Sequence, residues 1–189
     1  FVNGKEAKIN APIDAMNLGM GLLPDDRKAE GIVADLSVRE NIILAIQAKQ
    51  GVLKKIPMAK QCEIADKYID LLQIKCASRE TLIKQLSGGN QQKVVIGKGL
   101  LTKPKILLLD EPSRGVDIGA KTEVFEIIHD LAEKGLSIIV ISSELKEIMA
   151  IADRIVVLSN GKKTGELTGD EITEDTLVRT SYAGLGTGR

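Results

Sequence analysis

The sequence predicts an α/β protein with a mainly parallel sheet flanked by helices, and three observations lead to this fold class. Residues 106–109 form a continuous apolar run between Pro104 and Pro112, as is typical of a strand buried on both faces of a parallel sheet. Residues 136–142 form a second run of this kind. Between residues 58 and 74 the apolar residues follow helical spacing, which predicts an amphipathic helix.

The start of the chain predicts a turn, a short helix and a strand. Residues 1–2 and the Asn-Gly-Lys that follows them indicate a strand entering a tight hairpin turn. A short helix is expected at about Pro12–Asn17, and an apolar strand is expected at residues 18–23, where Pro24 ends it. Charged residues then follow directly, which places them at the carboxyl end of this strand.

Residues 26–103 have a predominantly helical pattern. Ser37 and Glu40 have the spacing of a capping box, in which each residue satisfies the backbone N–H of the other, and this predicts the start of a helix. Another helix is expected at 58–74, and one more at about 90–101, after a Ser-Gly-Gly turn.

The rest of the chain predicts two further α/β segments and a tail. A helix is expected at residues 120–133, before the buried strand 136–142. A hairpin is expected next, with strands at 155–158 and 163–167 on either side of a Ser-Asn-Gly-Lys turn. A helix at about 170–179 is expected to close the domain, followed by a flexible tail over 182–189.

Two carboxylates, Asp110 and Glu111, follow the first apolar run directly. Ligands of open α/β sheets sit at the carboxyl ends of the strands, so both side chains are expected beside a ligand. One carboxylate of such a pair can hold Mg²⁺, directly or through water, and the other can polarise an attacking water.

A second candidate site is the turn Ser87-Gly88-Gly89 at the start of the helix expected over 90–101. A hydroxyl and unobstructed backbone N–H groups at a helix N-terminus form an anion site. Taken alone, this turn also fits an ordinary helix start, and an acidic residue after an apolar strand is common. The Ser-Gly-Gly turn and the acidic pair occurring together at this spacing indicate phosphate chemistry much more strongly than either feature alone.

These motifs resemble those of ATP-binding cassette (ABC) ATPases. LSGGNQQK (86–93) is similar to the signature loop of the family, ILLLDEP (106–112) to its Walker B strand with the catalytic Glu, and SRGVD (113–117) to its D-loop. Together with PDDRK (24–28) and SSELKEI (142–148), these motifs resemble those in the second nucleotide-binding half of tandem subunits of monosaccharide importers, of the ribose, galactose and xylose type. The resemblance covers residues 2–177.

The resemblance implies ATP and Mg²⁺ as cofactors and assigns a role to each matching residue. Glu111 becomes the catalytic base, and Asp110 becomes a metal ligand. Asp25 stands where most members have a Gln that contacts metal and water, although the residues alone also fit a solvated loop. Ser143 stands where the family has a switch histidine. The expected nucleotide-binding residues are Leu86, Ser87, Gly88, Gly89, Asn90, Gln91 and Asp117.

The phosphate-cradling pattern G-x-x-x-x-G-K-[ST] is absent from the sequence. Residues 115–122 end in a similar Lys-Thr but lack the second glycine, and Asp117 within them would repel phosphate. The chain also begins at Phe1 rather than Met. We therefore expect an N-terminally truncated P-loop-NTPase-like ABC core. Residues 1–189 would be the C-terminal portion of one nucleotide-binding domain, with a helical lobe at about 26–103.

Three functions remain open at this stage. The first is an ATP-hydrolysing subunit that energises monosaccharide uptake from the cytoplasmic side of the membrane. The second is a degenerate partner domain that completes another half's ATP site without hydrolysing, which Ser143 and Asp25 favour. The third is a soluble ABC ATPase acting on nucleic acid or ribosomes. Balanced charge, with 26 basic and 26 acidic residues, and the absence of Trp argue against this third function.

The partners that the resemblance implies are the first ABC half of the same tandem protein, the membrane-spanning permease subunits and, indirectly, a sugar-binding protein. No nucleic-acid partner is expected. The two halves would pair head to tail, because the signature helix is expected in the helical lobe, away from the sheet edge that carries Asp110 and Glu111. Members that import nucleosides share LSGGNQQK, but the intact Asp110-Glu111-Pro112 favours sugar.

Overall fold

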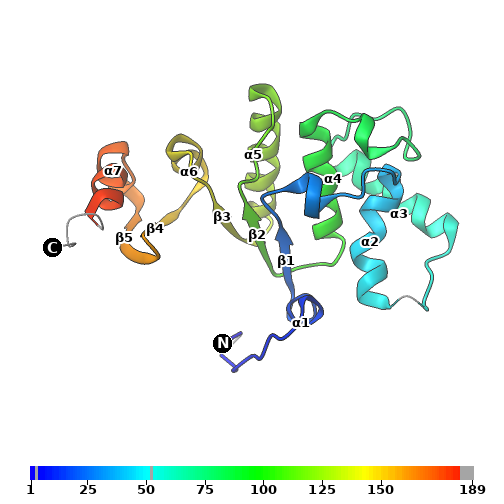
Figure 1. The fold of residues 1–189 in the computed structure, drawn as a ribbon, viewed down its shortest axis with the longest axis horizontal. Helices are drawn as coiled ribbons and strands as arrows, with labels where there is room; N and C mark the ends of the chain where they lie inside the picture. Colours follow the sequence, from blue (N-terminus) through cyan, green and yellow to red (C-terminus); the bar gives the residue numbers. More distant parts are fainter. Residues whose placement is uncertain (3, 52, 184–189) are drawn as a thin grey trace. The chain divides into compact units, whose positions relative to one another are not determined.

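The computed structural model describes residues 1–2, 4–51 and 53–183. These residues form two compact units, one that ends at Ile141 and one that begins at Ser142 (Figure 1). Each unit has an apolar core of its own. The assignment of all 189 residues to one domain stays a prediction. The strands expected at 18–23 and 106–109, whose ends carry the candidate acidic residues, lie in the first unit.

A three-stranded parallel sheet organises the first unit. Its strands are β1 (Met20–Leu23), β2 (Ile106–Asp110) and β3 (Ser137–Ile141), in the order β1-β2-β3. Leu23 pairs with Leu109, and Asp110 pairs with Ile141. The predicted α/β class and the parallel pairing are confirmed.

The two faces of this sheet are covered unequally by the described residues. Leu23, Leu107 and Leu109 are fully buried on one face. On the other face Leu22, Leu108 and Ile139 lie in one row across the three strands, and Leu22 and Ile139 are 63% and 51% exposed.

The prediction that 136–142 is a strand buried on both faces is therefore wrong for the described part of the chain. The strand is shorter, Ser137–Ile141, and alternates between exposed and half-buried residues. Its apolar sequence predicts burial on both faces, but β3 is the edge of the described sheet, and Ile138 and Val140 are its residues that pack against the apolar core.

Five α-helices of the first unit lie within the described residues. They are α1 (Pro12–Asn17), α2 (Val38–Gln50), α3 (Met58–Leu71), α4 (Gly88–Leu100) and α5 (Ile118–Glu133). Of these, α1, α4 and α5 contact the sheet directly. Figure 1 shows α2, α3 and α4 gathered on the β1 side of the sheet. The predicted capping box forms, because Ser37 caps α2 and Glu40 accepts from the Ser37 backbone N–H at 2.8 Å.

The helical region expected over residues 26–103 shares one continuous core with the sheet. Ile42 of α2, Ile83 of the short 3-10 helix before α4, and Ile96 of α4 are fully buried in the same cluster as Leu109 of β2. This packing fixes α4 against β1 and α5, so the sheet positions the start of α4.

The second unit contains α6 (Leu145–Ile151), β4 (Arg154–Ser159), β5 (Lys162–Thr168) and α7 (Glu174–Tyr182). The antiparallel pairing of β4 with β5 confirms the predicted hairpin. The last helix begins and ends later than predicted, because Thr173 caps its first turn and the helix extends through Tyr182.

Two expectations concern the chain's ends. Val2 and Lys5 exchange two backbone hydrogen bonds, as the expected turn requires, while Asn3 lies outside the described residues. Residues 184–189 of the expected flexible tail also lie outside them. Within the described ranges, no helix is both long and apolar enough to cross a membrane.

Candidate functional site

The carboxyl ends of β1 and β2 bring the predicted acidic residues to one edge of the sheet. The two strands run parallel and Leu23 pairs with Leu109, so Asp25 and Asp110 both follow the last paired positions at the same edge. Asp110 is half-buried and pairs with Ile141 of β3. The predicted position of this carboxylate beyond an apolar strand is confirmed.

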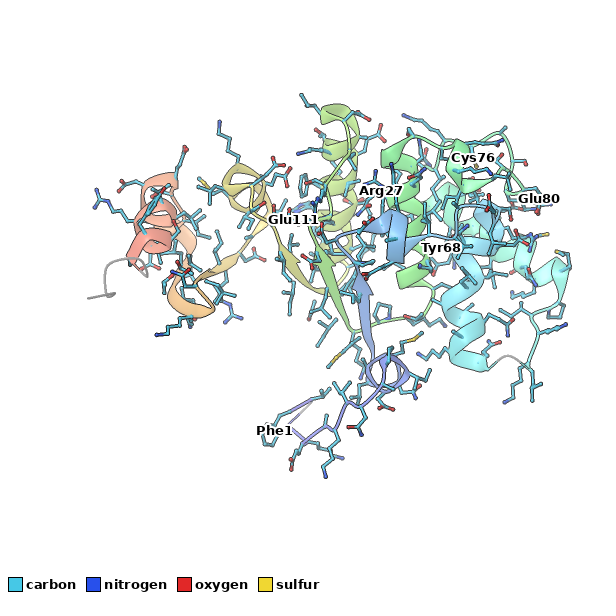
Figure 2. The ribbon with its side chains drawn as sticks, in the orientation of Figure 1. Phe1, Arg27, Tyr68, Cys76, Glu80 and Glu111 are labelled. Atoms are coloured by element: carbon cyan, nitrogen blue, oxygen red, sulfur yellow. The ribbon has the colours of Figure 1, made fainter. Side chains whose placement is uncertain are left out.

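Glu111 begins a tight turn away from the sheet. Its backbone N–H donates to the carbonyl of Ile141 at 2.8 Å, and its carbonyl accepts from the N–H of Arg114 at 3.0 Å. Its φ of 43° lies in the left-handed region, which is uncommon for a residue other than glycine and is found disproportionately at functional sites. Figure 2 shows Glu111 at the end of β2. This turn directs the chain out of the sheet immediately after the acidic pair.

Asp25 is engaged by a residue of the loop that follows Glu111. The Arg114 guanidinium donates to Asp25 Oδ2, and this hydrogen bond raises the pKa of Arg114. The other carboxylate oxygen, Oδ1, is buried and has no hydrogen-bond partner. The metal and catalytic roles of Asp25 stay predictions. Of its two carboxylate oxygens, Oδ2 is bound by Arg114, so Oδ1 is the one with no protein partner to compete with a metal ion.

The donor set at this edge fits Mg²⁺. Asp110 and Asp25 Oδ1 supply hard oxygen atoms, and protein sites for Mg²⁺ commonly use one or two carboxylates together with phosphate and water. Among the described residues there is no cluster of three or more His, Cys, Asp or Glu that could enclose a metal by itself. The arrangement therefore fits an ion that a nucleotide would help to hold.

The Ser-Gly-Gly turn forms the start of α4, as predicted. Ser87 is exposed and caps the helix: its Oγ accepts from the Asn90 backbone N–H at 3.5 Å and from Asn90 Nδ2 at 2.9 Å. Asn90 Oδ1 in turn accepts from the backbone N–H of Lys75 at 2.7 Å. An exposed hydroxyl beside the N-terminus of a 13-residue helix can bind an anion.

Two residues of the predicted nucleotide site have side chains that face inward. Leu86 belongs to the apolar core, and Gln91 is 7% exposed. Gln91 Nε2 donates to the carbonyls of Leu86 and Ile83 at 3.1 and 3.3 Å, which holds the segment leading into the signature turn. The role of Leu86 and Gln91 in nucleotide binding stays a prediction. In the structure, the two side chains hold the backbone that leads into the Ser-Gly-Gly turn.

Close packing accounts for both glycines of the turn. A Cβ at Gly88 would lie 2.7 Å from Arg27 Nη2 and 2.8 Å from the carbonyl oxygen of Gly115. A Cβ at Gly89 would lie 2.4 Å from the Cβ of Ala120 in α5. The first turn of α4 thus packs against the loop that follows Glu111 and against the start of α5.

Replacement of Gly89 by Ala is therefore expected to destabilise the fold by about 1–3 kcal/mol, because the starts of α4 and α5 would have to separate. Urea denaturation of both proteins measures the difference. Gly119→Ala is the matched control: its Cβ would meet only Asp117 Oδ1, at 3.6 Å, and Ala favours the helix. Equal stability of the Gly89→Ala variant and the wild type would contradict the packing argument.

Asp117 and Ser143, the two remaining candidates, lie in different units. Asp117 caps α5, since its Oδ1 accepts from the Ala120 N–H at 3.0 Å. Ser143 stands just before α6 in the second unit, next to Ser142, whose Oγ accepts from the Glu144 N–H at 3.1 Å. Their roles toward nucleotide stay predictions.

Sequence reasoning missed Arg27. This side chain is only 8% exposed and donates to the carbonyls of Arg114 and Gly115, the latter at 3.0 Å. Burial lowers the pKa of its guanidinium, and the charge of Asp26 opposes that shift. The only signal in the sequence is a basic residue after two aspartates at a strand end, which is also typical of a solvated loop.

Comparison with known proteins gives consistent relatives. The ABC transporter family matches residues 2–114. The galactofuranose transporter ATP-binding protein YtfR of Escherichia coli (strain K12) is 46% identical over 178 residues, which are 94% of this chain and 36% of that protein. The ribose import ATP-binding protein RbsA of Caldanaerobacter subterraneus subsp. tengcongensis is 43% identical over 185 residues, 97% of this chain and 37% of that protein. The chain thus spans about a third of the length of these curated relatives.

Solved structures share the fold. A nucleotide-free ATP-binding cassette from an ABC transporter matches 93% of this chain and 72% of its own, with a TM-score of 0.76 and 24% identity. A dimeric cassette in a post-hydrolysis state, bound to ADP and Pi, matches 79% of this chain and 62% of its own, with a TM-score of 0.66 and 22% identity. Together with the family match over residues 2–114, these findings show that the chain belongs to the ABC transporter family.

Proposed function

We propose that this chain is part of the ATP-binding and ATP-hydrolysing subunit of an ABC importer that takes up a monosaccharide. The observation that carries the proposal is the similarity to sugar import ATP-binding proteins, at 42–46% identity over 94–97% of the chain, for galactofuranose, ribose and xylose. The acidic edge supports it, because Asp110 would serve there as a metal ligand and Glu111 as a base.

The cofactors would be ATP and Mg²⁺. Asp110 and Asp25 Oδ1 would hold the ion, which neutralises phosphate charge when bound. Glu111 would accept hydrogen bonds from the attacking water and orient it. Ser87 and the backbone N–H groups at the start of α4 would donate to phosphate oxygens.

The partners would be a second ABC half, permease subunits in the membrane and a sugar-binding protein that delivers the substrate. The phosphate-cradling pattern is absent from residues 1–189, and we propose that another segment supplies it, since the relatives are about three times as long as the stretch matched. A dimeric cassette among the similar structures supports pairing of two halves. The place of action would be the cytoplasmic face of the membrane, with the subunit bound there peripherally.

Uptake of labelled sugars tests the substrate class. A strain lacking the gene should lose uptake of one monosaccharide among ribose, xylose, galactose, fructose and galactofuranose, and the wild-type gene should restore it. Uptake of nucleosides serves as the control. Loss of nucleoside uptake with sugar uptake intact would overturn the proposed substrate class.

The 189-residue chain by itself is expected to bind Mg-ATP poorly. The backbone cradle and the lysine that grip the β- and γ-phosphates in P-loop proteins are absent from its sequence. Isothermal titration calorimetry checks this expectation. A dissociation constant in the low micromolar range would show that the described residues form a complete ATP site.

A further inference from the structure

Arg27 joins three segments that the proposed function uses separately. It lies in the π-helical turn Arg27–Gly31, just after the strand that leads to Asp25. Its Nη1 donates to the carbonyl of Arg114 and its Nη2 to the carbonyl of Gly115 at 3.0 Å. The same Nη2 lies 2.7 Å from the position of a Cβ on Gly88, at the start of α4. One side chain therefore joins the segment after β1 to the loop after Glu111 and lies against the signature turn.

The chemistry of this contact is unusual for a purely structural arginine. Both named acceptors are neutral carbonyl oxygens, and Nε is buried with no partner. Burial of a guanidinium without a carboxylate partner is costly. Asp26 does not act as that partner through its Oδ1, which caps its own turn by accepting from the N–H groups of Lys28 and Ala29 at 3.0 Å.

A second, reciprocal contact links the same segments. While Arg27 donates to the backbone of Arg114, the Arg114 side chain donates back to Asp25. The two interactions differ in exposure, because Arg27 is buried and the Arg114 side chain is 66% exposed. The pair fixes the loop 113–117 to the segment 25–27 from both sides.

We propose that Arg27 is a positioning residue for ATP hydrolysis, which holds the Glu111 turn and the signature turn in one fixed arrangement. The backbone N–H of Arg114 donates to the Glu111 carbonyl at 3.0 Å, so fixing Arg114 and Gly115 also restricts the orientation of Glu111. Through Gly88 the same guanidinium sets the position of the helix start that carries Ser87. This inference rests on the proposed function and names a residue of the same site.

Arg27→Ala is expected to lower kcat for ATP hydrolysis at least about tenfold in a complete subunit that contains this chain, because misplacement of catalytic groups by about 1 Å can cost 10²-fold. KM for ATP should change little, since Arg27 donates its hydrogen bonds to the carbonyls of Arg114 and Gly115, neither of which is a proposed nucleotide ligand. Arg27→Lys should recover only part of the rate, because an ammonium lacks the planar fork that reaches two carbonyls.

Arg39→Ala is the matched control. Arg39 is also a buried arginine, 7% exposed, but it lies in α2 and binds Glu80 at 2.8 Å and Gln61. Its loss should destabilise the unit while leaving kcat per folded protein unchanged. A decrease in kcat equal to that of Arg27→Ala would overturn the positioning role.

Hydrogen exchange gives a readout that does not depend on catalysis. The N–H groups of Arg114 and Val116 donate within their own loop, to the carbonyls of Glu111 and Ser113. In Arg27→Ala they should exchange at least about tenfold faster, because hydrogen bonds from a charged group are among the stronger ones. In Arg39→Ala their exchange should match the wild type.

The two arms separate the inference from the proposed function. Faster exchange at 113–117 together with lower kcat in Arg27→Ala supports the positioning role, and wild-type exchange or wild-type kcat there overturns it. If Glu111→Gln hydrolyses ATP at the same rate as the wild type, the proposed hydrolysis by this chain fails instead. The hydrogen-exchange result does not affect that conclusion.

Discussion

Replacement of Glu111 by Gln is expected to lower ATP hydrolysis at the site of this chain by about 10²–10⁴-fold, the usual cost of removing a general base. This loss corresponds to about 3–5 kcal/mol of activation free energy. Nucleotide binding should persist, because the amide keeps the size of the side chain and the left-handed turn at this position is a property of the backbone. Single-turnover hydrolysis in a complete subunit, with ATP occupancy measured in parallel, is the required experiment.

Glu126→Gln is the matched control for this prediction. Glu126 is exposed on α5, and its replacement by Gln removes the same charge as Glu111→Gln does. Hydrolysis at the wild-type rate in Glu111→Gln, with this control also unaffected, would favour the degenerate partner domain. In that case Ser143, in the place of the family's histidine, would explain why this half does not hydrolyse ATP.

Replacement of Ser87 by Asp is expected to reduce closure and hydrolysis at the ATP site that this turn serves by at least about tenfold. Each hydrogen bond to a charged group contributes about 1.5–3 kcal/mol, and the new carboxylate adds repulsion against phosphate. Asp is as good a helix N-cap as Ser, so α4 should remain intact. Ser87→Asp tests the anion site without disturbing the packing, whereas a substitution at Gly88 would add a Cβ that collides with Arg27 and Gly115.

Ser87→Asn keeps both the cap and the neutral charge, so it should retain most of the activity. Nucleotide trapping resolved by site identifies which ATP is affected. In the proposed head-to-tail pairing, Ser87→Asp should empty the site of the other half and spare the P-loop of its own half. Loss confined to its own half would exclude that pairing.

The local elements of this fold could be predicted because their signals are local. The Ser37–Glu40 capping box, the strand that ends at Asp110 and the cap at Ser87 each depend on residues a few positions apart. Hydrogen bonds and periodicity at this range are visible in the sequence itself.

The arrangement around Arg27 could not be predicted in this way. Its carbonyl acceptors lie 87 and 88 residues further along the chain, and nothing in the motif PDDRK distinguishes a buried arginine from a solvated one. The exposure of β3 is a similar case. An apolar run predicts burial on both faces, but burial depends on which elements cover the strand, and Ile139 and Ile141 are each 51% exposed.

The most direct test of the central claim is ATP hydrolysis by the complete importer in proteoliposomes, with and without its sugar-loaded binding protein. We predict that the loaded binding protein stimulates hydrolysis, that sugar accumulates inside in step with it, and that Glu111→Gln abolishes most of both. Hydrolysis that proceeds at one rate regardless of sugar, with no accumulation, would contradict the assignment of this chain to a sugar importer.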